Sequence, residues 1–527
     1  MKNESAEHIV KKLTTLKIRN HNRLKKLKNK FAAKYKSPIV TNADLLSVYR
    51  KMVKQKKIKT DDSIEKLLRK RAIRTMSGVA PIAVLTKHYE CPGNCVFCPS
   101  EKEMPKSYLS NEPAVMRAIL NKFNPYEQVK TRLRALYQNG HNTDKIELIV
   151  MGGTFNFFPR QYQTWYIKRC FDACNKRTAK NLAEAQKWNE KAKHRIVGLT
   201  LETRPDYINE KELANFRRLG CTRVEIGVQA IDDKILKKNN RQSTVADIIK
   251  ATKLMKQSGF KVAYHMMPNL PGATVNKDFK MFEELFHNPD FQPDMLKIYP
   301  TVVTDNSKLY NWWKKGLYKP YTDKQLLDLL IKIKMIIPRY VRIIRLIRDI
   351  PKESIEAGNM ITNLRQIISD KLKVEDIYCK CIRCREARDN TKNAHKARFY
   401  VEEYEASEGT EYFLHYSSYN KKILYAFCRL RLNKPMKHFI PELQDSAIIR
   451  EVHTYGKLVS IDKKEGQTIQ HLGFGRRLMI EAEAIAQKEG FTKISVISGI
   501  GVRGYYKKLG YKLDGTYMSK KLKNIRT

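Results

Sequence analysis

From about residue 76, short apolar runs alternate with amphipathic segments. Six apolar runs predict β-strands: VAPIAVLT, KIELIVMGG, RIVGLTLETR, CTRVEIGVQ, FKVAYHMMP and DMLKIYPT. The segments between them, such as TVADIIKATKLMKQSG, carry apolar residues at helical spacing. This alternation predicts repeated βα units around a mostly parallel sheet, and six strands fit a partial (βα)6 barrel better than a closed barrel of eight.

The pattern changes on both sides of this region. Near the N-terminus, apolar residues recur at helical spacing in IVKKLTTLKI and DLLSVYRKMV, so a helical bundle is expected, with Thr41 or Asn42 capping its second helix. The C-terminal part begins with β-rich alternation, passes through a glycine-rich turn into the helix GFGRRLMIEAEAIAQKEG, and ends with a strand and a helix. We expect an α/β protein with four segments: 1–75, 76–370, a charged connector at 371–395, and 396–527.

The charge balance is strongly basic. The 102 lysines and arginines outnumber the 54 acidic residues, which gives a net charge of +48. Such an excess favours a nucleic acid as partner, although a lysine-rich proteome would also produce it. Residues 1–75 alone hold 23 basic and six acidic residues. We therefore expect this segment to bind nucleic acid.

Cysteine usage indicates metal rather than disulfides. Ten cysteines are too few for a disulfide scaffold in a chain of 527 residues, and six of them form two tight trios. The N-terminus has no apolar signal region, and no stretch approaches the ~18 apolar residues that suggest a membrane span. We expect a cytoplasmic protein with no membrane partner.

The first trio is Cys91, Cys95 and Cys98, in ECPGNCVFCPS directly after the first predicted strand. This spacing suits three corners of a [4Fe–4S] cluster whose fourth iron stays free to bind a substrate. Most electron-transfer clusters and closed zinc sites use four protein ligands. A zinc site completed by a distant His or Cys is the alternative.

Glycines and polar residues follow or end the next strands. Gly152, Gly153 and Thr154 come after KIELIVM, where glycines would let the backbone approach a cofactor, or would simply form a βα turn. Other polar residues lie at or near strand ends, where they would contact a cofactor or form salt bridges around the barrel mouth: Glu202, Arg204, Glu225 and Gln229.

Many segments together resemble the catalytic subunit of Elongator. They include RTMSGVAPIAVLTK, DKIELIVMGGTF, GLTLETRPDYI, GCTRVEIGVQ, GFKVAYHMMPNLPG, CKCIRCRE, REVHTYG, QHLGFGRRLM and GYYKKLGYKL, in order from about residue 40 to the C-terminus. The resemblance implies a radical S-adenosylmethionine (SAM) domain joined to a GNAT-type acetyltransferase domain, and an enzyme that modifies the wobble uridine of tRNA. The compact cysteine spacing is nearer the bacterial pattern, and PSEK replaces the usual PGG after Cys98.

The C-terminal glycine motif also indicates a cofactor by itself. Gln470, Gly473 and Gly475 come at the start of an amphipathic helix. The backbone N–H groups of such a glycine-rich turn hold a pyrophosphate in many proteins. A purely structural turn is the alternative. The resemblance implies an acetyl-CoA site between the two domains. The residues that it assigns to acetyl-CoA are Glu451, Val452, His453, Thr454, Phe474, Gly475, Arg476, Tyr506 near the thioester, and Lys145 of the radical domain.

The second trio is Cys379, Cys381 and Cys384, whose spacing is too tight for an easy cubane. The resemblance implies a structural zinc (Zn²⁺) here, and reduced surface thiols are the alternative. Its fourth ligand stays open among Cys428, His395 and His415.

The resemblance implies the following chemistry. A [4Fe–4S] cluster and SAM generate a radical on the acetyl group of acetyl-CoA, and a carboxymethyl group is attached to carbon 5 of uridine; Tyr506 and Lys145 are the expected catalytic residues. The expected partners are the tRNA anticodon stem-loop and either Elongator-like subunits or a second copy of the chain. A protein lysine acetyltransferase and a tRNA-binding scaffold subunit are the alternatives.

Overall fold

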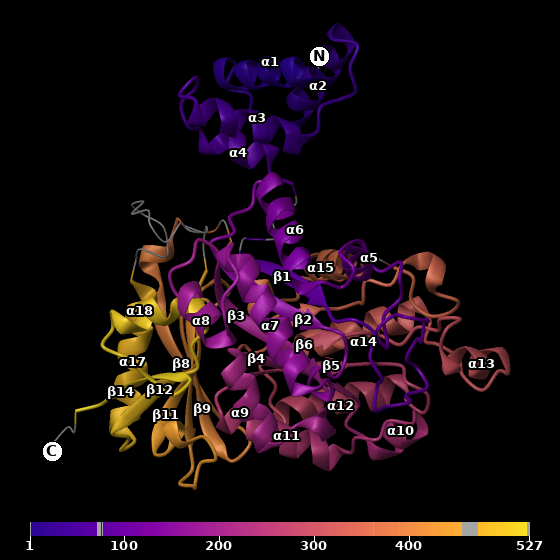
Figure 1. Ribbon diagram of the computed structural model, residues 1–527. Helices are drawn as coiled ribbons and strands as arrows, with labels where there is room; N and C mark the ends of the chain where they lie inside the picture. Colours follow the sequence, from indigo (N-terminus) through magenta and orange to yellow (C-terminus); the bar gives the residue numbers. More distant parts are fainter. Residues whose placement is uncertain are drawn as a thin grey trace.

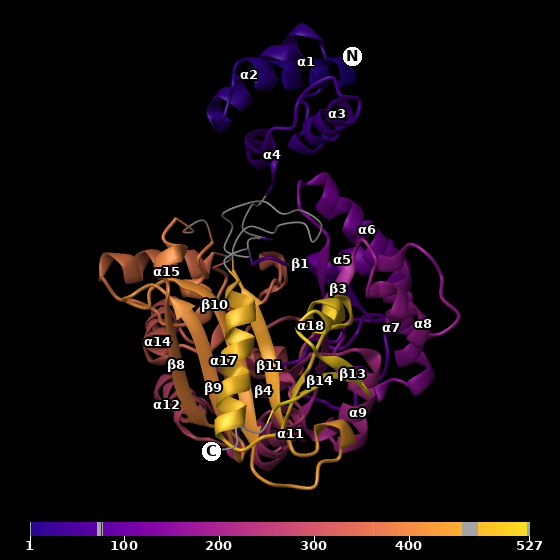
Figure 2. The ribbon, with the colours of Figure 1, turned by 90° about the vertical axis from the view of Figure 1, so that its left-hand side faces the viewer.

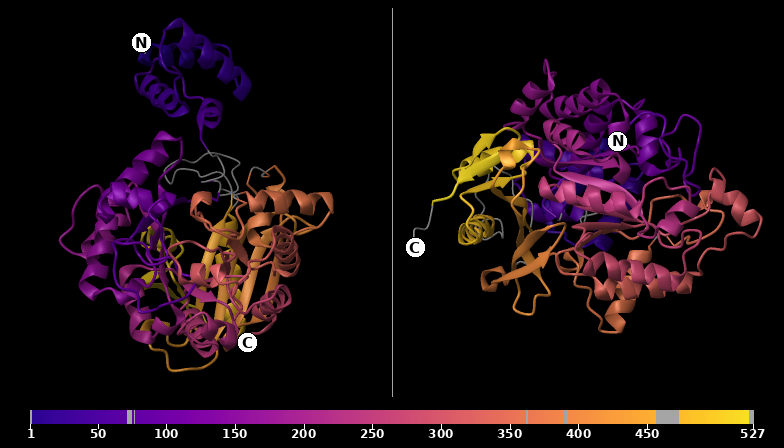
Figure 3. Two further views of the ribbon diagram at one scale, coloured as in Figure 1. Left: turned by 90° about the vertical axis from the view of Figure 1, so that its right-hand side faces the viewer. Right: turned by 90° about the horizontal axis from the view of Figure 1, so that it is seen from below.

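A computed structural model describes residues 2–70, 75, 77–361, 363–388, 390, 392–455 and 473–523. These residues form a helical bundle, a half-barrel of parallel strands and a C-terminal mixed sheet (Figure 1). The bundle stands apart from the other two parts in Figures 1 and 2 and in the left panel of Figure 3, and the C-terminal sheet lies beside the half-barrel (Figures 2 and 3).

The N-terminal bundle has four helices: α1 (Lys2–Thr15), α2 (His21–Lys34), α3 (Asn42–Lys54) and α4 (Asp62–Leu68). Of the two expected caps, Thr41 caps α3, and its side chain forms a capping box with Asp44. The apolar faces pack into a core separate from that of the rest of the chain. Hydrogen bonds from Arg50 to the Tyr137 carbonyl and from Arg69 to the Gly140 carbonyl, at 2.7 and 2.8 Å, connect the bundle to the half-barrel.

The central part confirms the α/β half-barrel but adds a strand to the six expected. Its strands are β1 (Ala80–Leu85), β2 (Lys145–Met151), β3 (Arg195–Thr203), β4 (Arg223–Gln229), β5 (Lys261–Met266), β6 (Met295–Ile298) and β7 (Arg342–Arg345). They lie side by side in chain order, and every neighbouring pair is parallel. The missed strand β7 has only the four residues RIIR, too few to show a period of two among surrounding arginines.

Helices accompany the strands of the half-barrel (Figure 1). They are α5 (Pro113–Leu120), α6 (Pro125–Gln138), α7 (Arg160–Asn175), α8 (Leu182–Asn189), α9 (Glu210–Leu219), α10 (Asp233–Lys238), α11 (Val245–Gln257), α12 (Val275–His287), α13 (Lys308–Lys314), α14 (Asp323–Ile336), α15 (Leu364–Val374) and α16 (Ile382–Arg385). They cover its outer face, apart from α13, which projects from the body, and α16, which lies on the connector. The expected boundary between residues 370 and 371 falls inside α15. No helix in the described ranges has both the length and the apolar character needed to cross a bilayer.

The C-terminal part is a seven-stranded mixed sheet in the order β13-β14-β12-β11-β10-β9-β8, with α17 across it (Figure 2). Its elements are β8 (Arg398–Glu405), β9 (Gly409–Ser417), β10 (Leu424–Asn433), β11 (Ser446–Thr454), α17 (Phe474–Lys488), β12 (Lys493–Val496), α18 (Arg503–Lys507), β13 (Lys512–Asp514) and β14 (Tyr517–Lys521). The closing hairpin of β13 and β14 was not expected, because its strands are short and lysine-rich.

A buried ionic network joins the half-barrel to the C-terminal sheet. Arg450 of β11 donates hydrogen bonds to both carboxylate oxygens of Asp294, at 2.5 and 2.8 Å, and to Glu411 at 3.0 Å. Lys256 lies within 4 Å of both carboxylates, and Arg429 lies 3.5 Å from Asp294. All five side chains are at most 1% exposed. The two parts also share one hydrophobic core, so they form a single structural unit.

We expect replacement of Arg450 with methionine to lower the free energy of unfolding by about 3–5 kcal/mol, because it leaves two buried carboxylates without their main partner. The matched control is Lys493→Met, which removes the partly exposed pair with Asp514 at 3.2 Å and should cost at most ~1 kcal/mol. Guanidinium unfolding followed by circular dichroism measures both. Equal losses of unfolding free energy in the two variants would contradict the stabilising role of the ionic network.

The same interface predicts acid sensitivity. Although burial opposes it, the positive charges of Lys261 and Arg429 lower the pKa of Glu451 to about 2. A carboxylate whose pKa is depressed on folding stabilises the protein above its unfolded pKa of about 4.3, and this contribution is lost as pH falls toward 2. Glu451→Gln should therefore flatten the fall of unfolding temperature between about pH 5 and pH 2.

Candidate active site in the half-barrel

A cavity of about 1160 Å³ occupies the interior of the half-barrel and is lined by residues of all seven strands. It brings together ten of the residues expected from the sequence to hold a cluster or cofactor: Cys91, Cys95, Cys98, Gly152, Gly153, Thr154, Glu202, Arg204, Glu225 and Gln229. They converge because the carboxyl ends of parallel strands meet at one edge of the sheet.

The cysteine loop follows β1 and is held by its own backbone. The Cys98 N–H donates to the Cys95 carbonyl at 3.2 Å, and the Gly93 N–H donates to Cys91 Sγ at 3.4 Å. Cys95 is buried, and the other two thiols are half-buried. In the part of the chain that the structure describes, the three sulfur atoms of this trio do not all lie within 4.8 Å of one another.

Two buried arginines lie beside these thiols. Arg241 Nη1 is 3.7 Å from Cys95 Sγ, and Arg204 pairs with Asp206 at 2.6 Å while its Nη1 has no hydrogen-bond partner among the described residues. A Cβ at Gly93 would lie 1.8 Å from Arg204 Nη1, so a larger residue there would displace the Arg204 guanidinium. The Cys98 hydrogen bond and both arginines lower the pKa of Cys95 to about 5, although burial opposes them. The site therefore favours a thiolate and a negatively charged occupant.

The glycine pair after β2 is also required by its surroundings. Gly152 has φ +135°, and a Cβ there would lie 1.9 Å from the buried Thr86 Oγ1, which has no described partner. Gly153 has φ +90°. Thr154 is buried at the cavity wall. Gly152 also lines the cavity, and its N–H donates to a Glu202 oxygen at 3.4 Å.

A network of charges crosses the cavity floor. Lys297 of β6 pairs with Glu225 of β4 and lies 3.5 Å from Glu202 of β3. Tyr108 donates to Glu202 at 2.9 Å, and His265 contacts Glu225 at 3.1 Å. Although burial opposes them, Lys297 and its neighbours hold the pKa of Glu225 well below its usual value. Glu225 therefore stays ionised.

Sequence reasoning missed several of these cavity residues. They are Tyr108, Arg241, His265 and Lys297. His265 and Lys297 belong to predicted strands, and the inward position of each on its strand was the available signal. Tyr108 and Arg241 lie on loops, where no periodicity marks them.

Two residues at the end of β11 face the half-barrel. Glu451 accepts from Arg429 at 3.0 Å and pairs with Lys261 of β5 at 3.4 Å. His453 Nε2 lies 2.9 Å from the Ser77 carbonyl, just before β1. Since side chains alternate along a strand, Val452 and Thr454 face the other side, toward α17.

The parallel pairing of β11 with β12 ends at Ile449 and Val496, and from there to Thr454 β11 is paired, among the described strands, only with β10. A Cβ at Gly475 would lie 3.0 Å from the Tyr505 hydroxyl and 3.6 Å from Thr454 Oγ1. Gly473, with φ +71°, begins α17, whose first turn holds the buried Phe474 and the exposed Arg476. The buried Tyr506 lies on α18. Gln470 lies outside the described residues.

Lys145 opens β2 at the other end of the strands from the cysteines. It pairs in register with Arg195 of β3. A Cβ at Gly501, in the turn before α18, would lie 2.6 Å from Arg195 Cβ. Burial lowers the pKa of Lys145. The residue therefore lies on the side of the half-barrel that meets the C-terminal part.

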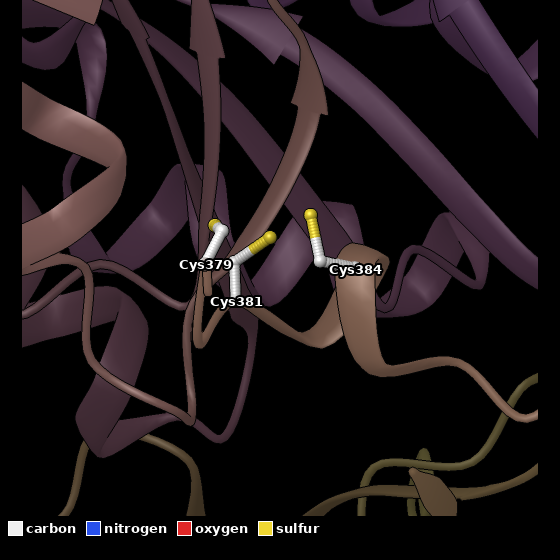
Figure 4. A group of neighbouring side chains, drawn as sticks. All are labelled: Cys379, Cys381 and Cys384. Atoms are coloured by element: carbon white, nitrogen blue, oxygen red, sulfur yellow. The ribbon is translucent and has the colours of Figure 1, made fainter. Parts of the chain in front are cut away.

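The second cysteine trio gathers on the connector (Figure 4). The sulfurs of Cys379, Cys381 and Cys384 all lie within 4.8 Å of one another, and Lys334 Nζ is 3.5 Å from Cys384 Sγ. Three thiolates on one tetrahedral zinc ion would stand ~3.8 Å apart, from Zn–S bonds of ~2.3 Å. None of the three candidate fourth ligands, Cys428, His395 and His415, joins this group in the described structure.

Comparison with known proteins gives consistent matches. The Radical SAM superfamily model matches residues 86–285, and the Radical_SAM C-terminal domain model matches residues 293–374. The chain is 48% identical over 472 residues to the tRNA uridine(34) acetyltransferase of Methanocaldococcus infernus, covering 86% of this chain and 88% of that protein. It is 40% identical over 523 residues to human Elongator complex protein 3, covering 95% and 93%. A solved structure of the Methanocaldococcus infernus Elp3 with residues 1–46 deleted aligns with a TM-score of 0.73 and 44% identity, covering 85% of this chain and all of that one.

Proposed function

Because the chain belongs to the family of Elongator complex protein 3 and the tRNA uridine(34) acetyltransferases, we propose that it attaches a carboxymethyl group to carbon 5 of the wobble uridine of tRNA. The observation that carries the proposal is the cavity, in which the three cysteines, the glycine pair and the two glutamates meet. A single site of this size has room for a cofactor and a flipped base together.

The cysteine loop fits a [4Fe–4S] cluster. It offers three thiols, a lowered pKa at Cys95 and two arginine side chains that balance negative charge. When bound, the cluster and SAM supply a radical that abstracts hydrogen, and acetyl-CoA supplies the two-carbon group. The protein contributes by placing these groups and excluding water.

Residues of the cavity wall would hold SAM. The open backbone at Gly152 and Gly153 leaves room for its methionine end, and Thr154, Arg204 and Gln229 add polar contacts. Glu202 and Glu225 would accept hydrogen bonds from an ammonium or from hydroxyl groups. Lys297 keeps the two carboxylates in place by pairing with both.

The end of β11 and the start of α17 would hold acetyl-CoA. The N–H groups of the first turn of α17, from Gly473 to Arg476, are suited to a pyrophosphate. Glu451 to Thr454 would line the pantetheine arm, with Tyr506 near the thioester and Lys145 approaching from the half-barrel. Because Glu451 and His453 contact the half-barrel directly, a thioester held here is close to the interface between the two parts.

The N-terminal bundle and the basic connector would hold the tRNA. Phosphate contacts from lysines and arginines supply affinity without reading sequence, and the anticodon loop offers unstacked bases to the cavity. Cys379, Cys381 and Cys384 would bind zinc and stabilise the connector. We also propose that the chain works with Elongator-like subunits or as a homodimer.

Replacing Gly152 with alanine should weaken SAM binding at least tenfold, because the new Cβ would collide with Thr86 and would need φ +135°. The matched control is Gly490→Ala, which also has positive φ (+84°) but no atom within 4 Å of the new Cβ. Calorimetric titration with S-adenosylhomocysteine measures both. Unchanged affinity in Gly152→Ala would argue against SAM at the glycine pair.

A further inference from the structure

The cysteine loop is held on its outer side by two helices. The Val96 N–H donates to the carbonyl of Asn239, which follows α10, and the Leu309 N–H of α13 donates to the Val96 carbonyl, both at 3.0 Å. Val96 is buried and, unlike Cys95 and Cys98, does not line the cavity. The helices α10 and α13 therefore lie against the side of the loop that faces away from the cavity.

The surface that these helices present is basic. It carries seven exposed lysines and only two exposed aspartates, Asp233 and Asp305. The lysines are Lys234, Lys237, Lys238, Lys308, Lys314, Lys315 and Lys319. We call this surface the α10–α13 face.

Large apolar side chains lie among these lysines. Trp312 and Trp313 of α13 are only half-buried, and Leu317 is 68% exposed. Lys314 Nζ lies 5.3 Å from the ring centroids of both Tyr310 and Trp313. In Figure 1, α13 projects from the body of the molecule at its right-hand edge. Aromatic anchors with a charged rim are typical of protein–protein interfaces.

We propose that the α10–α13 face docks an acidic one-electron donor protein that reduces the cluster. This inference rests on the proposed function, because it requires a cluster on Cys91, Cys95 and Cys98. One electron passes from the reduced centre of the donor to the oxidised cluster; the donor is oxidised by one electron, and no bond is made or broken. Docking here brings a donor to the cysteine loop while cofactor and substrate fill the cavity.

The positive charge of the α10–α13 face favours an acidic partner. Lysines around an aromatic patch steer an acidic protein and make its association sensitive to salt. A small contact that releases quickly is typical of electron-transfer pairs. Lysines and aromatics also suit RNA. However, a uridine must enter the cavity, and no residue of the α10–α13 face lines that cavity.

The test is anaerobic stopped-flow reduction of the reconstituted protein by an acidic flavodoxin in its hydroquinone form, followed by the loss of cluster absorbance. We expect the double variant Lys314→Glu/Lys315→Glu to be reduced at least tenfold more slowly than wild type at low salt, with little remaining salt dependence. Reduction by dithionite should be unchanged. The matched control replaces Lys187 and Lys191 with glutamate. Both are exposed residues at α8, on the opposite side of the molecule in Figure 1.

Binding of oxidised flavodoxin, measured by calorimetry, gives a second readout that does not depend on turnover, and the double variant should bind at least tenfold more weakly. Equal reduction rates in wild type and the double variant would overturn the docking site. So would a loss of tRNA affinity in that variant with unchanged flavodoxin binding. If the wild-type protein forms no cluster that dithionite can reduce, the proposed function fails as well.

Discussion

Replacing Cys98 with alanine should reduce carboxymethyluridine formation on tRNA to background. Cys98 lines the cavity beside Cys95, and each of the three thiols would hold a different iron, so its loss leaves too few ligands for the cluster. The measurement is mass spectrometry of nucleosides from tRNA incubated with the protein, SAM, acetyl-CoA and dithionite. Because the proposed tRNA-binding surface is elsewhere, tRNA affinity should stay within about twofold of wild type.

The matched control is Cys170→Ala. Cys170 is fully buried in α7, away from the cavity lining, and its loss removes a buried thiol without touching the proposed ligands. This variant should form a normal cluster and retain activity. A Cys98→Ala protein that still produces carboxymethyluridine would refute the mechanism, whatever its cluster content.

Removing residues 1–75 should weaken tRNA binding at physiological salt by a factor of at least ~100. The segment holds 23 basic and six acidic residues, and proteins that contact several phosphates lose affinity steeply with salt. The slope of log affinity against log salt should therefore also become shallower. The described part of the bundle packs around its own core, so the half-barrel should keep its cluster and its SAM affinity. Filter binding across a salt series measures the effect.

A smaller change tests the same surface without truncation. Lys25, Lys26 and Lys30 are exposed on α2, and their joint replacement by glutamine should give an intermediate loss of affinity. Replacing Lys187 and Lys191 by glutamine at α8 provides the control. Unchanged tRNA affinity after removal of residues 1–75 would refute the bundle as the tRNA-binding segment.

The parts of the site that could be predicted from sequence share one physical rule. In a parallel sheet, residues that follow successive strands meet at one edge, so the positions of Cys91, Gly152, Glu202 and Glu225 after or near the ends of apolar runs were enough to place them together. The half-barrel itself was predicted from the alternation of apolar runs with amphipathic segments.

The other parts of the site and fold depend on contacts between distant residues, which no local sequence pattern encodes. Lys297 pairs with two glutamates from other strands, and only the curvature of the sheet brings it there. Strand β7 is held by pairing with β6 rather than by its own four residues. The ionic network of Arg450 and Asp294 joins residues 156 positions apart, a separation at which sequence spacing carries no information.

The most direct test of the central claim uses acetyl-CoA whose acetyl methyl group carries deuterium. The account predicts that incubation with tRNA, SAM and dithionite yields carboxymethyluridine together with 5′-deoxyadenosine that has gained deuterium, both measured by mass spectrometry. Unlabelled 5′-deoxyadenosine alongside carboxymethyluridine would contradict hydrogen abstraction from the acetyl group. Acetylated lysine on a protein substrate, with no modified uridine, would contradict tRNA modification and favour a protein acetyltransferase.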